Sequence, residues 1–266
     1  MATATAAAGV TAGTVGGVRA HVERAPARRV GARPGEGATV LVYHRIGGGN
    51  PDEPDVATAD FTAQADLPAE LPPGRVVPLD EALDRIEASR CTPGTVLTFD
   101  NGFADVYDNA WTLPRERGLP FTVYLVSGHV GGEMRWEGSI AKTSGAPGPS
   151  RGHARPEPLG TAEPDACNDD VEQHLGVRSR HYAYTWGVPV PPMEPALRAR
   201  CRTAATGEVG RNTPGADPVR LCRMPVRPVR RTDPIDFLRA KLYGRLIPER
   251  AYARIVATAK AVGARA

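Results

Sequence analysis

The chain has 266 residues, a length that fits one large domain, and its 41% hydrophobic and 24% charged residues are typical of soluble globular proteins. Its net charge of +3 comes from scattered arginines, so the charge gives no case for nucleic-acid binding. No run of residues approaches the roughly 18 apolar positions of a membrane span. The segment Met1 to Ala20 lacks the basic and leucine-rich regions of a secretory signal, which favours a cytoplasmic protein.

The predicted organisation has two parts. Residues 1–38 are rich in Ala, Gly, Val and Arg, offer little to bury, and are expected to form a disordered extension. Residues 39–266 are expected to form the folded domain, which begins with a β-branched and aromatic run over 39–44 that predicts a buried strand. The four cysteines form no C-x-x-C pair, which excludes a zinc finger and favours free, mostly buried thiols.

The next elements follow one another through short connections. The patterns predict a helix from Leu79 with Asp80 as its N-cap, a strand over 95–99, a helix over 103–117 and a strand over 121–126. Strands and helices that alternate in this way favour parallel strands with crossover helices, and so an α/β fold.

The second half of the chain continues this alternation. The expected elements are a helix whose last turn is 171–175 and which ends at Gly176, a strand over 181–184, a helix over 193–201, a strand over 222–226, and two helices over 234–242 and 249–262. The segment 137–165 has no helical or strand period and is rich in Gly, Pro and Ser. A run of this length without structure is unusual inside a compact domain, and we interpret it as an eroded element.

The most informative motif is the apolar run that ends in Asp100, Asn101 and Gly102 and is followed by a helix-like segment. This is the layout of a strand that carries a functional carboxylate to the mouth of an α/β fold. Without further information, Asp100 could instead cap the following helix, and Asn101 could serve the tight turn before Gly102.

The stretch Thr98-Phe99-Asp100-Asn101-Gly102 resembles the T-F-D-D-G motif of the polysaccharide deacetylases, the NodB-homology family. The segments 40–46, 118–124 and 181–187 resemble further motifs of the family in the same order, so the resemblance extends over about 39–262. It implies a distorted (β/α) barrel, a carbohydrate partner, hydrolysis of an acetamide C–N bond and a divalent metal such as zinc. It also implies that Asp100 is the catalytic base.

The metal positions that the resemblance implies are degenerate. Asn101 stands where the family has a metal-binding Asp, and a neutral amide is a poor ligand by comparison. For the H-x-x-x-H motif two registers are open. In the preferred one, His153 keeps the second position and Pro149 replaces the first; in the other, the two positions are taken by Arg151 and Arg155.

Other candidates for the site follow from the same alignment of motifs. We expect His44, Tyr184 and Trp186 to contact the substrate, and Tyr43 or His44 to share a pocket with Asp100 and Trp186. A structural role for His44 and core packing for Trp186 are the alternatives. The arginine-rich segment 223–231 is expected at the solvated surface, and contact with an anionic sugar or a phosphate is the other interpretation.

Two functions therefore remain open. In the first, the protein is a carbohydrate deacetylase with Asp100 as base and a weak metal site formed by Asn101 and His153. In the second, it is an inactive relative that binds a sugar or a partner without turnover. The resemblance supports the first function, and the residues at the metal positions support the second.

Overall fold

The computed structural model describes residues 37–49, 55–67, 74–89, 94–127 and 163–226, together with Leu238. Several predictions concern residues outside these ranges: the disorder of nearly all of 1–38, the eroded segment 137–165 up to residue 162, His153, and the last two helices apart from Leu238. They stay predictions.

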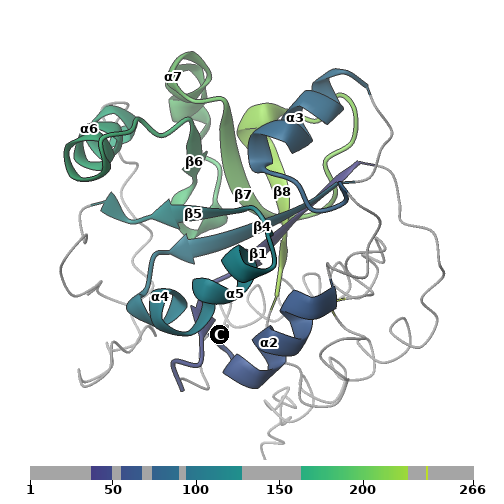
Figure 1. The fold of residues 1–266 in the computed structure, drawn as a ribbon. Helices are drawn as coiled ribbons and strands as arrows, with labels where there is room; N and C mark the ends of the chain where they lie inside the picture. Colours follow the sequence, from purple (N-terminus) through teal and green to yellow (C-terminus); the bar gives the residue numbers. More distant parts are fainter. Residues whose placement is uncertain are drawn as a thin grey trace, which may run out of the picture.

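Six parallel strands form a sheet that nearly closes into a barrel, and this confirms the predicted fold class, a distorted (β/α) barrel (Figure 1). The strands occur in the order β5-β4-β1-β8-β7-β6, so β5 and β6 are the two edges of the sheet formed by the described residues. Their bounds are Ala38–Tyr43 for β1, Gly94–Asn101 for β4, Phe121–Leu125 for β5, His181–Ala183 for β6, Thr203–Val209 for β7 and Leu221–Pro225 for β8. A separate parallel pair joins β2 (Arg45–Ile46) to β3 (Asp55–Val56).

Helices surround the sheet. They are α2 (Thr58–Asp66), α3 (Leu79–Glu87), α4 (Ala104–Ala110), α5 (Thr112–Glu116), α6 (Glu163–Leu175) and α7 (Glu194–Arg200), with short 3-10 turns η3 (Thr185–Gly187), η4 (Pro191–Met193) and η5 (Pro218–Arg220). In Figure 1, α2, α4 and α5 lie below the sheet, whereas α3, α6 and α7 lie above it. Within the described ranges no helix is long and apolar enough to cross a membrane.

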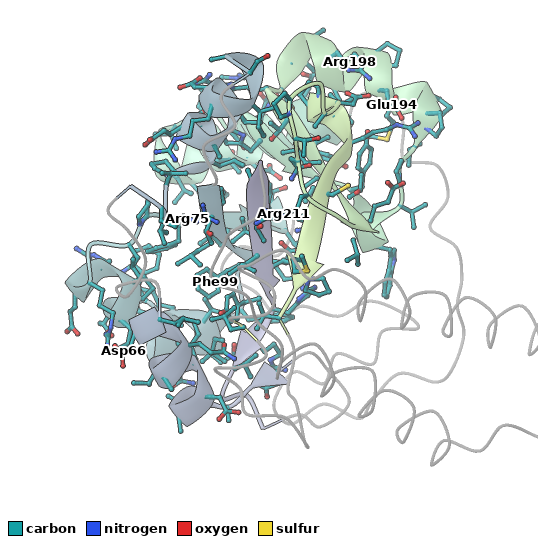
Figure 2. The ribbon with its side chains drawn as sticks, turned by 90° about the vertical axis from the view of Figure 1, so that its right-hand side faces the viewer. Asp66, Arg75, Phe99, Glu194, Arg198 and Arg211 are labelled. Atoms are coloured by element: carbon teal, nitrogen blue, oxygen red, sulfur yellow. The ribbon has the colours of Figure 1, made fainter. Side chains whose placement is uncertain are left out.

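Alternation along the central strands divides the core into two layers. On β1 and β4, Leu41, Tyr43, Leu97 and Phe99 face outwards and pack against α2 and α4, and Figure 2 shows Phe99 in this layer. The intervening residues face the barrel interior, where Val40 and Val96 pack with apolar side chains of α3. Because both faces of these strands are buried, they appear in the sequence as continuous apolar runs.

Three details differ from the sequence analysis. Asp80 is not the N-cap of its helix, because Pro78 occupies that position and α3 already begins at Leu79. The helix expected over 103–117 is divided into α4 and α5, since Pro114 has no amide hydrogen to donate to the carbonyl of Ala110. Of the four cysteines, Cys167, Cys201 and Cys222 are described; all three are half-buried, and none forms a disulfide with another described cysteine.

Candidate functional site

The carboxylate of Asp100 lies at the carboxyl end of β4, inside the barrel, and Asp100 is 8% exposed. The next two residues turn the chain sharply into α4, with φ of +75° at Asn101 and +70° at Gly102. Asn is among the few side chains that accept this left-handed conformation, and Gly accepts it without strain. The Asn-Gly pair therefore ends the strand directly after the carboxylate and leaves Asp100 at the barrel mouth.

Arg223 on β8 is the main partner of Asp100. Its Nη1 donates to both carboxylate oxygens, at 2.6 Å to Oδ1 and 2.7 Å to Oδ2. Its Nε donates to the carbonyl oxygen of Thr206 at 2.8 Å, and its guanidinium carbon lies 5.7 Å from the ring centre of Tyr124. The expectation that this arginine is solvated was wrong, since Arg223 is only 5% exposed. The rest of the segment, 227–231, lies outside the described residues.

His44 follows the last residue of β1 and faces the same carboxylate. Its Nε2 lies 3.9 Å from Oδ2 of Asp100, and its Nδ1 is buried and makes no hydrogen bond to any described residue. Burial lowers the pKa of His44 below its ordinary value, the charge of Arg223 lowers it further, and the charge of Asp100 acts in the opposite direction. The imidazole is therefore neutral near pH 7, with one ring nitrogen available to a ligand.

These groups border a cavity of about 750 Å³, which extends from the barrel mouth along the seam between β5 and β6. Trp186 stands at its rim with 62% of its surface exposed and a φ of +59°. The adjacent Gly187 explains this local fold: a Cβ atom there would come within 2.5 Å of the backbone nitrogen of Gly207. The close contact between the two glycines packs the turn η3 against β7, and most of the surface of Trp186 stays exposed.

All of the predicted site residues that the structure describes border this cavity, namely His44, Asp100, Asn101, Tyr184 and Trp186. They differ in what they offer to a ligand. Tyr184 is 3% exposed and its hydroxyl donates to the carbonyl of Val219 at 3.1 Å, so only part of its ring faces the space. Tyr43 does not line the cavity: its ring packs against Phe61 and Phe99, and its hydroxyl donates to Gln64.

Arg223 was not predicted from the sequence as a residue of the site. A weak signal was present, because Arg223 interrupts a short apolar strand, Leu221–Pro225, in which a charge is not expected unless it has a buried partner. The sequence did not reveal which carboxylate that partner was.

The described residues do not fit a divalent metal. Both oxygens of Asp100 accept hydrogen bonds from the cation Arg223, and Asn101 contributes only a neutral amide. In the part of the chain that the structure describes, no three His, Cys, Asp or Glu side chains lie close enough to share an ion.

The sequence matches no family model and no curated protein. The fold, in contrast, is similar to that of several solved structures. They include IcaB from Ammonifex degensii (TM-score 0.59, 24% identity, 78% of this chain and 98% of that chain covered). A second is the Streptococcus pyogenes deacetylase PplD in complex with acetate (TM-score 0.55, 17% identity, 78% of this chain and 99% of that chain covered). A third is a de-N-acetylase from Aggregatibacter actinomycetemcomitans (TM-score 0.55, 14% identity, 76% of this chain and 99% of that chain covered). The resemblance that the motifs indicated is thus confirmed for the architecture: the described part of this chain has the fold of the polysaccharide deacetylases.

Proposed function

We propose that this protein is a carbohydrate deacetylase in which the barrel-mouth cavity takes the acetamido group of an amino sugar. Asp100 is the proton acceptor for hydrolysis of the acetamide C–N bond: it takes a proton from the attacking water as the new C–O bond forms and returns it to the leaving nitrogen as the C–N bond breaks. The observation that carries the proposal is the pairing of a buried carboxylate with a neutral imidazole 3.9 Å away, at the carboxyl ends of parallel strands. Two solved structures of similar fold, the deacetylase PplD in complex with acetate and a de-N-acetylase, support the same class of reaction.

The chemistry of the two groups is complementary to an acetamide. The carboxylate of Asp100 is paired with the guanidinium of Arg223, and its oxygens offer acceptors to a ligand. The imidazole of His44 can donate from one ring nitrogen, and its buried Nδ1 lacks a partner among the described residues. An acetamide offers one N–H donor and one carbonyl acceptor, so it can satisfy both groups at once.

Trp186 completes the proposed sugar site. Its exposed indole at the rim offers an apolar face on which the ring of a sugar can stack, next to the position of the acetamide. The contact needs no charge, so it would orient the sugar without competing with Asp100 for protons.

A second candidate function is binding without turnover. It is favoured by Asn101 in place of the carboxylate that the resemblance implies, and by the engagement of both Asp100 oxygens with Arg223. A base without a Lewis acid lacks a large part of the rate enhancement of metal hydrolases. Under this alternative the site keeps its shape and its affinity for the acetamide while acetate release is negligible.

One pair of measurements separates the two functions: calorimetric binding of an N-acetylglucosamine oligomer, and release of acetate from the same oligomer with and without added zinc. Under the main proposal the full chain binds and releases acetate, and Asp100→Asn lowers the rate by about 10²–10⁴-fold. Binding without acetate release supports the second candidate. The absence of binding contradicts both.

The role of Trp186 can be tested against a matched aromatic residue. Trp186→Ala should weaken sugar binding by roughly tenfold, because the stacking surface is lost. Tyr107 on α4 is 66% exposed but does not border the cavity, so Tyr107→Ala should leave sugar binding unchanged. Equal losses in the two variants would place the sugar elsewhere.

A further inference from the structure

Helix α4 holds the backbone that directly follows His44. Asp105 accepts a hydrogen bond from Nε of Arg45 at 2.6 Å and, through its other oxygen, from the amide of Ile46 at 3.4 Å. One turn later, Nδ2 of Asn109 donates to the carbonyl of Ile46 at 2.8 Å. Asp105 and Asn109, which we call the α4 clamp, thus bind side chain, amide and carbonyl of one short segment.

The clamp is sheltered from solvent. The side chains of Arg45 and Asp105 are 9% and 11% exposed, and the guanidinium carbon of Arg45 lies 4.9 Å from the ring centre of Phe103. A buried, hydrogen-bonded ion pair has few alternative geometries of similar energy, because any displacement leaves a charge without its partner. The contact therefore defines one position for the segment.

Two glycines allow the backbone to lie so close to α4. A Cβ atom on Gly48 would come within 2.7 Å of Oδ2 of Asp105 and 2.8 Å of Nε of Arg45. Gly47 has a φ of +68°, and a Cβ atom there would lie 2.3 Å from Oγ1 of Thr58 and 3.2 Å from Nδ2 of Asn109. The pair Gly47-Gly48 is thus the local sequence feature that makes the clamp possible.

Helix α4 is also close to Asp100 in the sequence. Asp105 comes five residues after Asp100, and α4 begins directly behind the Asn101–Gly102 turn. The clamp therefore links the end of β4, which carries Asp100, to the end of β1, which carries His44. These are the two groups whose 3.9 Å separation underlies the proposed acetamide site.

We infer that Asp105 and Asn109 are positioning residues, which set the place of His44 relative to Asp100 by holding Arg45 and Ile46 on α4. The inference rests on the proposed function for its chemical meaning, but the positioning itself can be measured in the protein without a ligand. Neither residue borders the cavity, so neither is expected to touch a substrate.

The test is an NMR titration of the His44 ring in the full chain, with the signal assigned by its loss in His44→Gln. In Asn109→Ala and Asp105→Asn, the imidazole should gain solvent, and the pKa of His44 should move up toward the ordinary 6.5. The charged groups that act on His44 are Asp100 on β4 and Arg223 on β8, and both variants leave them in place. A purely structural role for the clamp would lower the melting temperature without shifting this titration.

Asp66→Asn is the matched control. Asp66 on α2 (Figure 2) accepts a hydrogen bond from Nε of Arg117, the residue after α5, at 2.7 Å. The control variant therefore also converts to an amide a carboxylate that connects two elements. The Asp66–Arg117 pair does not include any residue of the α4 clamp or of the segment after β1, so the titration of His44 should not change.

An unchanged His44 titration in folded Asn109→Ala would overturn the inference. That variant loses one hydrogen bond and no charge, so it keeps the test valid if Asp105→Asn does not fold. A shifted titration in a protein that binds no acetamido sugar would support the positioning role and contradict only the proposed function.

Discussion

The two ends of the barrel hold ion pairs of the same residue types in different surroundings. At the carboxyl end, Asp100 and Arg223 face each other with side chains 11% and 6% exposed. At the amino end, Arg202 lies among Asp80, Asp84 and Glu87 of α3, whose side chains are 41–65% exposed. One carboxylate is matched to one cation inside the barrel, whereas at the surface three carboxylates surround Arg202 and one of them, Asp80, also lies 3.6 Å from Arg180.

The two contacts therefore have different roles. The buried pair positions charged groups at the cavity, whereas the surface cluster connects two elements of the fold. The buried pair borders a cavity and leaves His44 in reach of the same carboxylate. The surface cluster attaches α3 to the start of β7 and includes His181, whose Nε2 lies 3.5 Å from Asp80. In water, such exposed pairs contribute little free energy, while a buried charge depends on its partner.

The largest effect is expected from Arg223→Met. Removal of the cation leaves Asp100 as an unpaired buried charge, which should lower the free energy of unfolding by about 3–5 kcal/mol in a denaturant titration. The double variant Asp100→Asn/Arg223→Met should be more stable than Arg223→Met alone, because no unpaired charge remains. If the double variant is the less stable of the two, the pair contributes through packing rather than charge.

Glycines at the two ends provide the next comparison. Gly187→Ala should cost about 2–3 kcal/mol, since it combines a φ of +68° with a Cβ atom 2.5 Å from Gly207. Gly215, before η5, has a φ of +85° but no atom within 4 Å of its Cβ position, so Gly215→Ala should cost only the backbone strain of about 1–2 kcal/mol. Thermal unfolding of both variants measures the difference, and equal costs would argue against the close contact of Gly187 with β7.

Asp80→Asn tests the surface cluster. We expect a loss of at most about 1 kcal/mol, because Asp84 and Glu87 remain beside Arg202. The loss should shrink further between roughly 0.05 M and 0.5 M salt, since exposed charges are screened. A loss as large as that of Arg223→Met, and independent of salt, would show that the surface cluster contributes to stability in the same way as the buried pair.

The smallest effect concerns pH. Burial lowers the pKa of both His44 and His181 in the folded protein, whereas the unfolded chain titrates near the ordinary 6.5. Below that pH the unfolded state binds more protons, so the stability present above about 6.5 is lost as the pH falls through the folded pKa values. His44→Gln and His181→Gln should each flatten the decline of unfolding free energy between about pH 7 and pH 5; an unaltered slope in both would contradict their burial.

Much of the fold could be predicted from the sequence, because strong local patterns coincide with the strands that are buried on both faces. The runs at β1, β4 and β5 are apolar or β-branched and are bounded by Gly and Pro, so their existence and order were predicted correctly. Strand β7 was missed, because Thr203-Ala204-Ala205-Thr206-Gly207 consists of small residues without a bulky alternation. Its small side chains suit a crowded wall of the barrel, where Gly187 approaches Gly207, and a local pattern does not reveal this crowding.

The sequence by itself determined the position of the Asp100 carboxylate at the end of a strand. An apolar run that ends in Asp100, followed by an Asn-Gly turn, carries that side chain to a strand end through local backbone preferences alone. The tertiary structure alone decided the partners of the charges: Arg223, 123 residues away, meets Asp100, and Asp80 bonds to Arg202 instead of capping α3. The physical reason is that a cap or a turn depends on neighbours in the chain, whereas an ion pair forms wherever folding brings two charges together with water excluded.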